Sequence, residues 1–293
     1  MAAPSNDNAS DPWTHPSVLV GLVGTGIQAS RTPRLHEREG AEQGLRYVYK
    51  LIDLEVYGLD ATALPDILKA AELFGFAGLN ITHPCKQAVI PLLDELSPDA
   101  AALGAVNTIV LKDRRRVGHN TDWWGFAESF RRELPDVRRD RVVQFGAGGA
   151  GAAVAHALLT LGAGEVIVID TDEGRAEHLV SALRERFGPS RASTGIPVAK
   201  ALMTADGMVN TTPLGMAKYP GMVIPSDLLR PDLWVADIVY FPLETELLRQ
   251  ARARGCRTMS GGGMAVFQAV GAFRLFTGRE PDPARMLRSF SEM

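Results

Sequence analysis

Residues 141–151 read RVVQFGAGGAG, and this stretch decides the fold of the second half of the chain. The apolar run Arg141–Phe145 predicts a buried strand, and glycines follow it in the spacing G-x-G-x-x-G. A run of small residues over 152–161 predicts a helix directly after the glycines, so the fingerprint has a strand–turn–helix context. The segment therefore predicts a turn that binds the pyrophosphate of a dinucleotide through Gly146, Ala147, Gly148, Gly149, Ala150 and Gly151.

Each glycine of the fingerprint has a physical reason. The first permits a tight turn, the second lets the backbone approach the pyrophosphate, and the third lets helix and strand pack closely. The N-terminus of the helix adds unpaired N–H groups and a partial positive charge, both of which favour phosphate. The alternative is a plain tight turn with no ligand.

An acidic residue stands where the fingerprint requires one. Asp170 ends the predicted strand Glu165–Asp170, 24 residues after Gly146, near the roughly 20 expected of a residue that accepts from the adenosine ribose hydroxyls. Its carboxylate would repel a 2′-phosphate, Asp172 and Glu173 would add to that repulsion, and no arginine immediately follows it. We therefore expect NAD rather than NADP. A helix cap near Thr171 is a second role for Asp170, and the two are compatible.

Strands and helices alternate along the 293 residues, which is typical of α/β domains with a mostly parallel sheet. The expected strands are 18–23, 47–54, 78–82, 105–111, 116–120, 141–145, 165–170, 207–211 and 234–237. The expected helices are 32–44, with Thr32 as its cap and Gly44 as its end, then 61–74, 84–93, 100–103, 152–161, 175–187, 243–254 and 264–277. The glycines 261–263 are expected to precede the last helix.

Composition narrows the class of protein. Hydrophobic residues make up 46% and charged residues 22%, as in globular proteins. The net charge of −3 provides no electrostatic footprint for nucleic acid or an anionic membrane. The two cysteines, Cys85 and Cys256, form neither a disulfide framework nor a CxxC zinc pair, so no metal is expected. Residues 1–17 lack the apolar core of a secretory signal and predict a flexible N-terminal tail on a cytoplasmic protein.

Polar residues in the first half follow the predicted strands. Residues at the carboxyl ends of parallel strands converge on the edge where ligands bind. Taken singly, each also has an ordinary structural role as a helix cap, a turn former or a solvated side chain. The residues are Ser30, Thr32, Asn80, Thr82, Lys86, Asn107, Thr108 and Asp122.

Together these segments resemble the shikimate dehydrogenase family. Residues 30–36 (SRTPRLH) resemble its SxSP…H segment, 80–86 (NITHPCK) its NVTxPxK, and 104–108 (GAVNT) its GAxNT. Residues 118–122 (GHNTD) resemble GxNTD, and 210–216 (NTTPLGM) resemble NxTPxGM. The segments 237–240 (DIVY) and 263–268 (GMAVFQ) complete the set, which occurs in family order from residue 21 to about residue 278.

Two departures from the family pattern narrow the resemblance. The second serine of the first motif is Thr32 here, and the usual NADP-reading Asn-Arg-Thr is Asp170-Thr171-Asp172. Both departures resemble the branch of NAD-dependent quinate/shikimate dehydrogenases. The added methyl of Thr32 would reshape the pocket near C1 of the substrate, where quinate and shikimate differ.

The resemblance implies a role for each matching residue. Lys86 and Asp122 would be the catalytic pair, with Lys86 exchanging the proton of the ring hydroxyl that is oxidised and Asp122 orienting lysine and substrate. The substrate carboxylate would bind Ser30, Thr32 and Tyr240, and the ring hydroxyls would bind Asn80, Thr82, Asn107, Asp122 and Gln268. The nicotinamide would lie against Ile238, Gly261 and Met264, and the loop along the cofactor would be Thr211, Thr212 and Pro213.

The expected architecture is therefore two α/β domains flanking a cleft. A substrate-binding domain takes residues 18–121 and 262–293, and a Rossmann-type NAD domain takes residues 122–261. Two alternatives stay open: an NADP-dependent shikimate dehydrogenase of aromatic biosynthesis, and a catalytically silent nucleotide-binding regulatory protein. The partners expected are small molecules, quinate and shikimate, and the oligomeric state is open, with a homodimer as one candidate.

Overall fold

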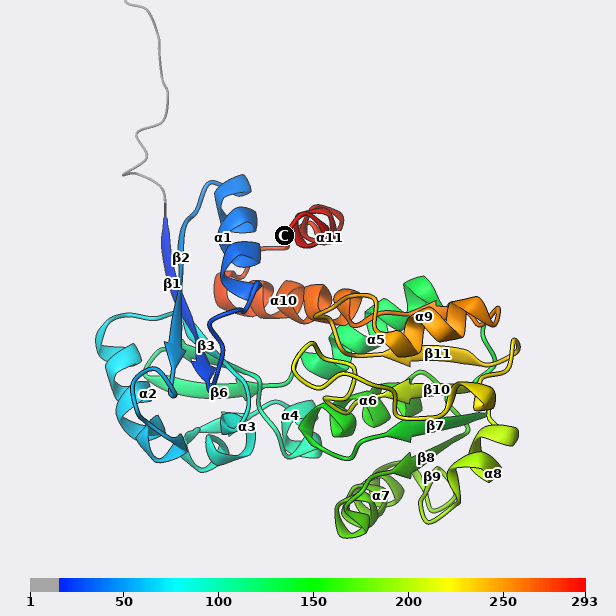
Figure 1. Cartoon of the computed structure of the whole chain (residues 1–293). Helices are drawn as coiled ribbons and strands as arrows, with labels where there is room; N and C mark the ends of the chain where they lie inside the picture. The colour runs from blue at the N-terminus through cyan, green and yellow to red at the C-terminus, as the bar shows by residue number, and fades with distance from the viewer. Residues whose placement is uncertain (1–15) are drawn as a thin grey trace, which may run out of the picture. The chain divides into compact units, whose positions relative to one another are not determined.

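The computed structural model describes residues 16–293, which divide into two compact units (Figure 1). Unit 1 comprises the described residues up to Leu96, together with Thr108–Gly118 and Ala272–Met293, and unit 2 comprises Ser97–Asn107 and His119–Gly271. A flexible tail was predicted over residues 1–17, of which residues 1–15 lie outside the described part of the chain. Ser17 is the first residue of the first strand, so the predicted tail extends too far at its end.

The sheet of unit 2 has six parallel strands in the order β12-β11-β10-β7-β8-β9. Read from β9, this is the 3-2-1-4-5-6 order of the doubly wound dinucleotide-binding fold. The Rossmann-type expectation is therefore confirmed. The strands are β7 (Arg141–Phe145), β8 (Glu165–Ile169), β9 (Ala192–Ser193), β10 (Gly207–Asn210), β11 (Trp234–Asp237) and β12 (Thr258–Met259).

Helices cover both faces of this sheet because neighbouring strand residues point to opposite sides. Val142 packs with α5 (Asp122–Glu133), α6 (Gly149–Thr160) and α7 (Glu173–Phe187). Val143 packs with α8 (Val198–Met203) and α9 (Glu246–Ala253), and the one-turn helix η4 (Ser226–Leu228) contacts both. The strands β7 and β11 match their predicted bounds, whereas α5 and α8 were not predicted.

The last predicted helix begins three residues early, since α10 is Gly261–Thr277 and the three glycines form its first turn. A Cβ atom on Gly261 would overlap the backbone of Ile238, and one on Gly263 would overlap the Ser129 hydroxyl. The expectation that these glycines precede the helix is thus wrong. They are there because the helix start packs against α5 and the loop after β11 without room for side chains.

The sheet of unit 1 is mixed, in the order β2-β1-β3-β5-β6-β4. Strand β1 pairs in parallel with both β2 and β3, but β5 runs antiparallel to β3. The alternation that predicted a mostly parallel sheet therefore holds for the first three strands. The strands are β1 (Ser17–Gly24), β2 (Arg46–Asp53), β3 (Gly78–Ile81), β4 (Glu95–Leu96), β5 (Thr108–Lys112) and β6 (Arg115–His119).

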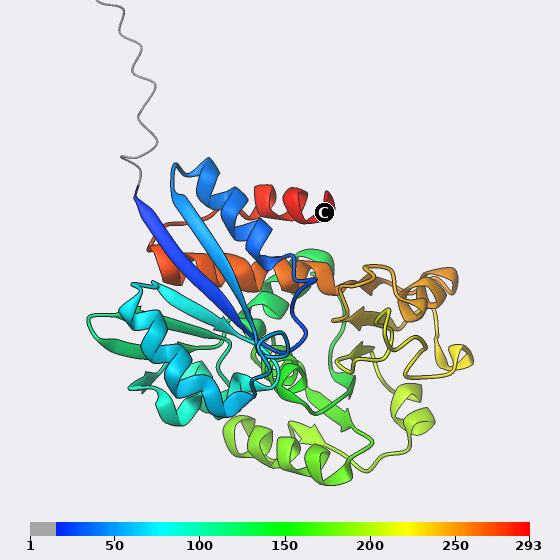
Figure 2. The ribbon, with the colours of Figure 1, turned by 60° about the vertical axis from the view of Figure 1, so that its left-hand side comes forward.

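Figure 2 shows α1 beside the C-terminal helix α11, and only the end of α10, from Ala272, belongs to the same unit. A core of Val20, Tyr47, Tyr49, Phe273 and Phe276 joins β1 and β2 to the end of α10. The helices of this unit are α1 (Thr32–Glu42), η2 (Ala61–Ala63), α2 (Leu64–Leu73), α3 (Cys85–Ala88), η3 (Ile90–Leu92) and α11 (Pro283–Ser291).

Helix α1 starts without the cap that the sequence predicts. Thr32 is its first helical residue, Arg31 holds the N-cap position, and the Arg31 side chain makes no cap hydrogen bond. Pro33 stands in the first turn as expected. Gly44 follows the helix with φ +67°, a left-handed conformation that favours glycine, so the predicted end is confirmed.

The domain boundaries of the structure differ from the predicted ones. Residues 97–107, 119–121 and 262–271 group with unit 2 rather than with the substrate-binding part. One reason is that α4 (Pro98–Leu103) packs against α6. Another is that Gly125 of α5 lies against α10, where its missing side chain leaves room for Met264 and Gln268. The roles assigned to the two domains remain predictions.

Candidate functional site

The glycine turn of unit 2 has the geometry of a phosphate-binding loop. Gly146 has φ +99°, and a Cβ on Gly151 would overlap the carbonyl oxygen of Gly146, so both positions require glycine. At Gly148 and Gly149 an added Cβ would meet no atom within 4 Å. The backbone there faces open space at the N-terminus of α6, where the N–H groups of the first turn fit a dinucleotide phosphate.

Two buried side chains donate hydrogen bonds to the carbonyl oxygens of this turn. The Nε2 atom of Gln144 donates to the carbonyl oxygens of Gly146 and Gly151, each at 2.9 Å. The hydroxyl of Thr211 donates to the carbonyl oxygens of Phe145 at 2.7 Å and Gly146 at 3.0 Å. Thr211 therefore lies beside the predicted turn. Gln144 was missed, because a glutamine inside an apolar strand has no sequence signal of its own.

Asp170 follows β8 and is bonded to the glycine turn. Its Oδ2 accepts from the backbone N–H of Ala147 at 2.7 Å, and its Oδ1 accepts from that of Asp172 at 2.9 Å. Partial burial would raise the pKa of Asp170, but these bonds and nearby Arg175 hold it below the ordinary value. The group is thus a carboxylate at neutral pH. The cap of α7 is Asp172 rather than Asp170, since the Asp172 carboxylate accepts from Arg175 N.

A buried carboxylate ties together the loops after β10 and β11. Oδ1 of Asp237 accepts from Asn210 Nδ2 at 3.0 Å and from Val239 N at 3.1 Å, and its Oδ2 accepts from Thr245 Oγ1 at 2.7 Å. Asn210 Oδ1 in turn accepts from the N–H and hydroxyl of Thr212. This network fixes the strand ends that carry the predicted cofactor residues Thr211, Thr212, Pro213 and Ile238.

Burial raises the pKa of Asp237 from 3.8 to about 6. Between pH about 4 and about 6 the folded state keeps the Asp237 proton while the unfolded state has lost it. The contribution of Asp237 to the free energy of unfolding of the wild-type protein should therefore fall as pH rises through this range. Asp237→Asn should abolish that loss, which for a shift of about two units is on the order of 3 kcal/mol. Urea unfolding across this range measures it, with the exposed Asp136→Asn as control. Equal pH slopes for wild type and Asp237→Asn would refute the assignment.

The three residues predicted to lie against the nicotinamide are close together at the start of α10. Gly261 lies directly against the backbone of Ile238, and Met264 is buried in the core cluster that Ile238 packs against. Tyr240 lies two residues beyond Ile238 and is 44% exposed. Three of the predicted residues thus lie together, and Tyr240 stands at the exposed end of the same loop.

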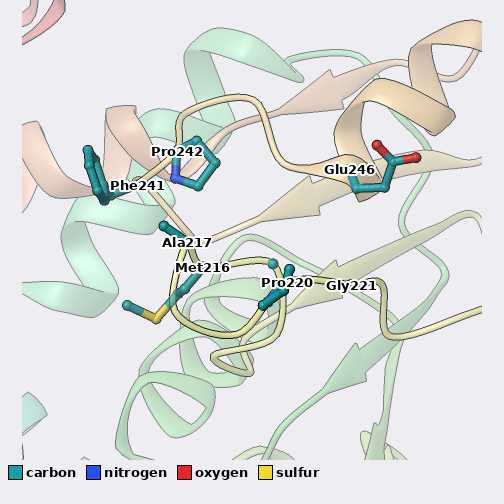
Figure 3. Close-up of a pocket in the computed structure, with 8 residues that line it drawn as sticks. Met216, Ala217, Pro220, Gly221, Phe241, Pro242 and Glu246 are labelled. Atoms are coloured by element: carbon teal, nitrogen blue, oxygen red, sulfur yellow. The ribbon is translucent and has the colours of Figure 1, made fainter.

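A pocket of about 270 Å³ lies on the loops after β10 and β11 (Figure 3). Met216 and Phe241 line it from the two loops, and Glu246 lies at its α9 side. None of the predicted cofactor residues lines it, although Thr211–Pro213 and Tyr240 are its near neighbours along the chain.

Of the predicted substrate residues in unit 2, Asn107 and Asp122 contact each other at the start of α5. Asp122 is the first residue of α5, and its Oδ1 accepts from Asn107 Nδ2 at 2.9 Å. Asn107 also bonds Thr121 in both directions, donating to its hydroxyl and accepting from its N–H. Gln268 lies on α10, which contacts α5 at Gly125. Asp122 is therefore a buried carboxylate held in one orientation, and it is not a helix cap.

In unit 1 Ser30 lies in the loop between β1 and α1, and Thr32 is the first residue of α1; both are half-buried. Ser30 Oγ accepts from Thr32 N at 3.3 Å. The loop is held by Asp53 at the end of β2, whose carboxylate accepts from the N–H groups of Gly26 and Ile27 at 2.9 Å. It also accepts from Gln28 Nε2 and from Glu55 N. Asp53 was not predicted, because it reads as the last residue of an alternating strand.

Burial would raise the pKa of Asp53, but the bonds from Gln28, Gly26, Ile27 and Glu55 outweigh it and hold the pKa below the ordinary value. A lowered pKa means stability that is present at neutral pH and lost as pH falls through the folded pKa. We expect Asp53→Asn to lower the thermal midpoint by several degrees at pH 7, and by less near pH 3. Scanning calorimetry at both values measures it. The exposed Glu55→Gln is the control, and a deficit that does not shrink in acid would contradict the role.

The remaining predicted residues of unit 1 lie in β3 or soon after it. Asn80, 4% exposed, accepts from the Tyr49 hydroxyl at 2.7 Å and donates to Thr108 Oγ1 at 3.0 Å. Thr82 is half-buried against Gly24, and Lys86 is half-buried in the single turn of α3. Unit 1 thus gathers five of the predicted residues, and the members of the predicted catalytic pair, Lys86 and Asp122, belong to different units.

His36, next to the first motif, is buried in a ring of aromatic side chains, and burial lowers its pKa to about 3. Its Nδ1 is 3.0 Å from the Tyr47 hydroxyl. Among residues 16–293, no group of three or more His, Cys, Asp or Glu side chains could hold a metal. In the same part of the chain, no helix is both long enough and apolar enough to cross a membrane.

Comparison with known proteins identifies the family. Residues 22–109 match the shikimate dehydrogenase substrate binding domain, and residues 261–289 match the shikimate 5′-dehydrogenase C-terminal domain. A protein of Streptomyces avermitilis named shikimate dehydrogenase (NADP(+)) is 61% identical, over 96% of this chain and 97% of its own. A quinate/shikimate dehydrogenase (NAD(+)) of Corynebacterium efficiens is 51% identical, over 94% and 98%.

A solved structure gives the same result for the fold. Quinate dehydrogenase from Corynebacterium glutamicum in complex with NAD matches with a TM-score of 0.90 and 47% identity, over 95% of this chain and 100% of that one. Its likeness extends over both units of the α/β fold described above. The chain therefore belongs to the shikimate dehydrogenase family, within which some close relatives are named for NADP and others for NAD.

Proposed function

We propose that this protein oxidises a ring hydroxyl of quinate and shikimate to the 3-dehydro product, with NAD as hydride acceptor. The names of its relatives support the substrate class, and they divide on the cofactor. The single observation that carries the choice of NAD is the Asp170 carboxylate, ionised at neutral pH and bonded to the glycine turn. A fixed negative charge there favours ribose hydroxyls and repels a 2′-phosphate.

The basic side chain that lies near Asp170 is already paired with another carboxylate. The first arginine after the strand is Arg175, and its guanidinium bonds the Asp172 carboxylate at 3.3 Å. The turn residues Gly146–Gly151 would hold the pyrophosphate, and Ile238, Gly261 and Met264 would flank the nicotinamide. The residues present thus fit a dinucleotide, and NAD more closely than NADP.

For the substrate, we assign the C1 carboxylate to the hydroxyls of Ser30, Thr32 and Tyr240. Neutral donors of this kind bind an anion without burying a second charge, whose desolvation would cost several kcal/mol. The ring hydroxyls would bind amide, hydroxyl and carboxylate groups. These groups are Asn80, Thr82, Asn107, Asp122 and Gln268.

The catalytic step removes a hydride from carbon and a proton from oxygen. NAD, when bound, accepts the hydride, so the protein must take the proton and hold the geometry. We assign the proton to Lys86 Nζ, and we assign Asp122 to orient lysine and substrate. The bond from Asn107 Nδ2 to Asp122 Oδ1 supports the orienting role of Asp122, because it anchors one of the two side-chain oxygens.

The test is the rate of NADH formation by purified protein with quinate and with shikimate at saturating NAD. We expect turnover of both, with the matching 3-dehydro acid as product. Turnover of shikimate alone, and only with NADP, would establish the biosynthetic alternative instead. No absorbance change with either acid and either cofactor would point to the silent regulatory alternative.

A further inference from the structure

Two tyrosines of β2 lie on the same face of the strand and are almost fully buried. Tyr47 and Tyr49 are 7% and 5% exposed, and both rings pack on His36. Their hydroxyl groups have different partners. The Tyr47 hydroxyl lies 3.0 Å from His36 Nδ1, whereas the Tyr49 hydroxyl donates to Asn80 Oδ1 at 2.7 Å. Only the second contact reaches a residue assigned to the substrate.

The contact between Tyr49 and Asn80 spans a whole strand. In the sheet, β1 lies between β2 and β3, and Val20 pairs with Tyr49 on one side while Leu22 pairs with Asn80 on the other. A side chain on β2 must therefore pass over β1 to reach Asn80, a distance of two strand spacings, about 9–10 Å. The Tyr49 and Asn80 side chains close this gap together, since their polar tips meet in the hydrogen bond.

The second end of the Asn80 amide is also engaged, since Nδ2 donates to Thr108 Oγ1 at 3.0 Å. If the amide were turned over, its NH₂ group would face the Tyr49 hydroxyl. Within the part of the chain that the structure describes, Asn80 Oδ1 is the acceptor of that hydroxyl, so turning the amide would strand a buried O–H. Burial, with Tyr47 close by, raises the pKa of Tyr49 well above 10, so the phenol keeps its proton.

We propose that Tyr49 is a positioning residue for substrate binding, which fixes the amide of Asn80 in the orientation that meets a ring hydroxyl. This inference rests on the proposed function, through the role assigned to Asn80. Without the phenolic O–H, Asn80 Oδ1 loses the donor that selects this orientation, and turning the amide no longer strands a buried hydroxyl. The orientation that meets a ring hydroxyl would then be held less firmly.

The variant Tyr49→Phe tests this, and Tyr47→Phe is the matched control. Both remove one buried hydroxyl from the same strand face, so both should lower the thermal midpoint by a similar amount. Only Tyr49→Phe should raise the KM for shikimate and quinate, by about 5- to 10-fold, the equivalent of one net hydrogen bond. Its kcat and its KM for NAD should stay within about twofold of wild type, as for a lost binding interaction.

Two further variants separate the inference from the proposed function. Asn80→Ala should raise the KM for the acids at least as much, and adding Tyr49→Phe to it should raise KM no further. If Asn80→Ala raises KM and Tyr49→Phe does not, the positioning role is overturned while the substrate contact stands. If Asn80→Ala leaves KM unchanged, the substrate contact itself is wrong and the positioning role falls with it. An equal rise in Tyr47→Phe would also overturn the role, because it would indicate general loosening.

Discussion

Lys86→Ala should lower kcat by about 10²- to 10⁴-fold, the range typical of losing a general acid or base. Lys86 is half-buried in the single turn of α3, directly after the strand-end residues Asn80 and Thr82. We assign it the proton of the hydroxyl that is oxidised, so its removal leaves that proton without a positioned acceptor. The measurement is single-turnover NADH formation at saturating substrate.

Substrate binding must be measured separately, by calorimetric titration of shikimate into the complex of the variant with the cofactor. Binding should weaken far less than turnover, because the hydroxyl and amide donors remain. The control is Gln87→Ala, which alters the exposed neighbour on the same helix and should leave kcat unchanged. Near-normal turnover by Lys86→Ala would remove Lys86 from the catalytic pair.

Asp170→Asn should shift the cofactor preference toward NADP, raising the ratio of kcat/KM for NADP to that for NAD by about 10- to 100-fold. The change removes a carboxylate that is ionised at neutral pH and bonded to the glycine turn at Ala147. Unit charges about 4 Å apart interact by about 1 to 4 kcal/mol at a protein surface, and each 1.4 kcal/mol is tenfold. The asparagine keeps the size and one acceptor of the original side chain.

The control for this prediction is Glu177→Gln. It removes one negative charge from the exposed surface of α7, farther along the same helix. We expect it to change the cofactor ratio by less than about threefold, since exposed charges are screened. If the two variants shift the ratio equally, the effect is one of net charge, and the specific role of Asp170 is wrong.

The strands that could be predicted well are those whose buried runs end abruptly. The strand β7 is a short apolar segment followed directly by glycine, and β11 is a short apolar segment that ends at the charged Asp237; both match their predicted bounds. Helix α5 was missed although Phe126 and Phe130 give it a buried face, because Gly125 and two tryptophans interrupt its pattern. The early start of α10 could not be predicted, since intrinsic propensity places three glycines outside a helix and packing overrides it.

Some residues of the candidate site could likewise be predicted from the sequence, and others could not. Residues in motifs at strand ends, such as Ser30, Asn80 and Asp122, could be named from the sequence because their order and neighbours are distinctive. Gln144 and Asp53 could not, since their roles depend on which backbone groups the fold brings to them. Tyr49 is a stronger example, because its contact with Asn80 exists only through the pairing of β1 with strands on both sides. Sequence patterns show an alternating strand there and nothing more.

We propose that this family member uses NAD, although a relative with 61% identity is named for NADP. The most direct test is the ratio of kcat/KM for NAD to kcat/KM for NADP, measured with shikimate at saturation and at one ionic strength. A ratio well above one, at least about tenfold, is the result expected from a carboxylate at the ribose end of the glycine turn. A ratio below one would contradict the account, because it would mean that Asp170 does not exclude the 2′-phosphate.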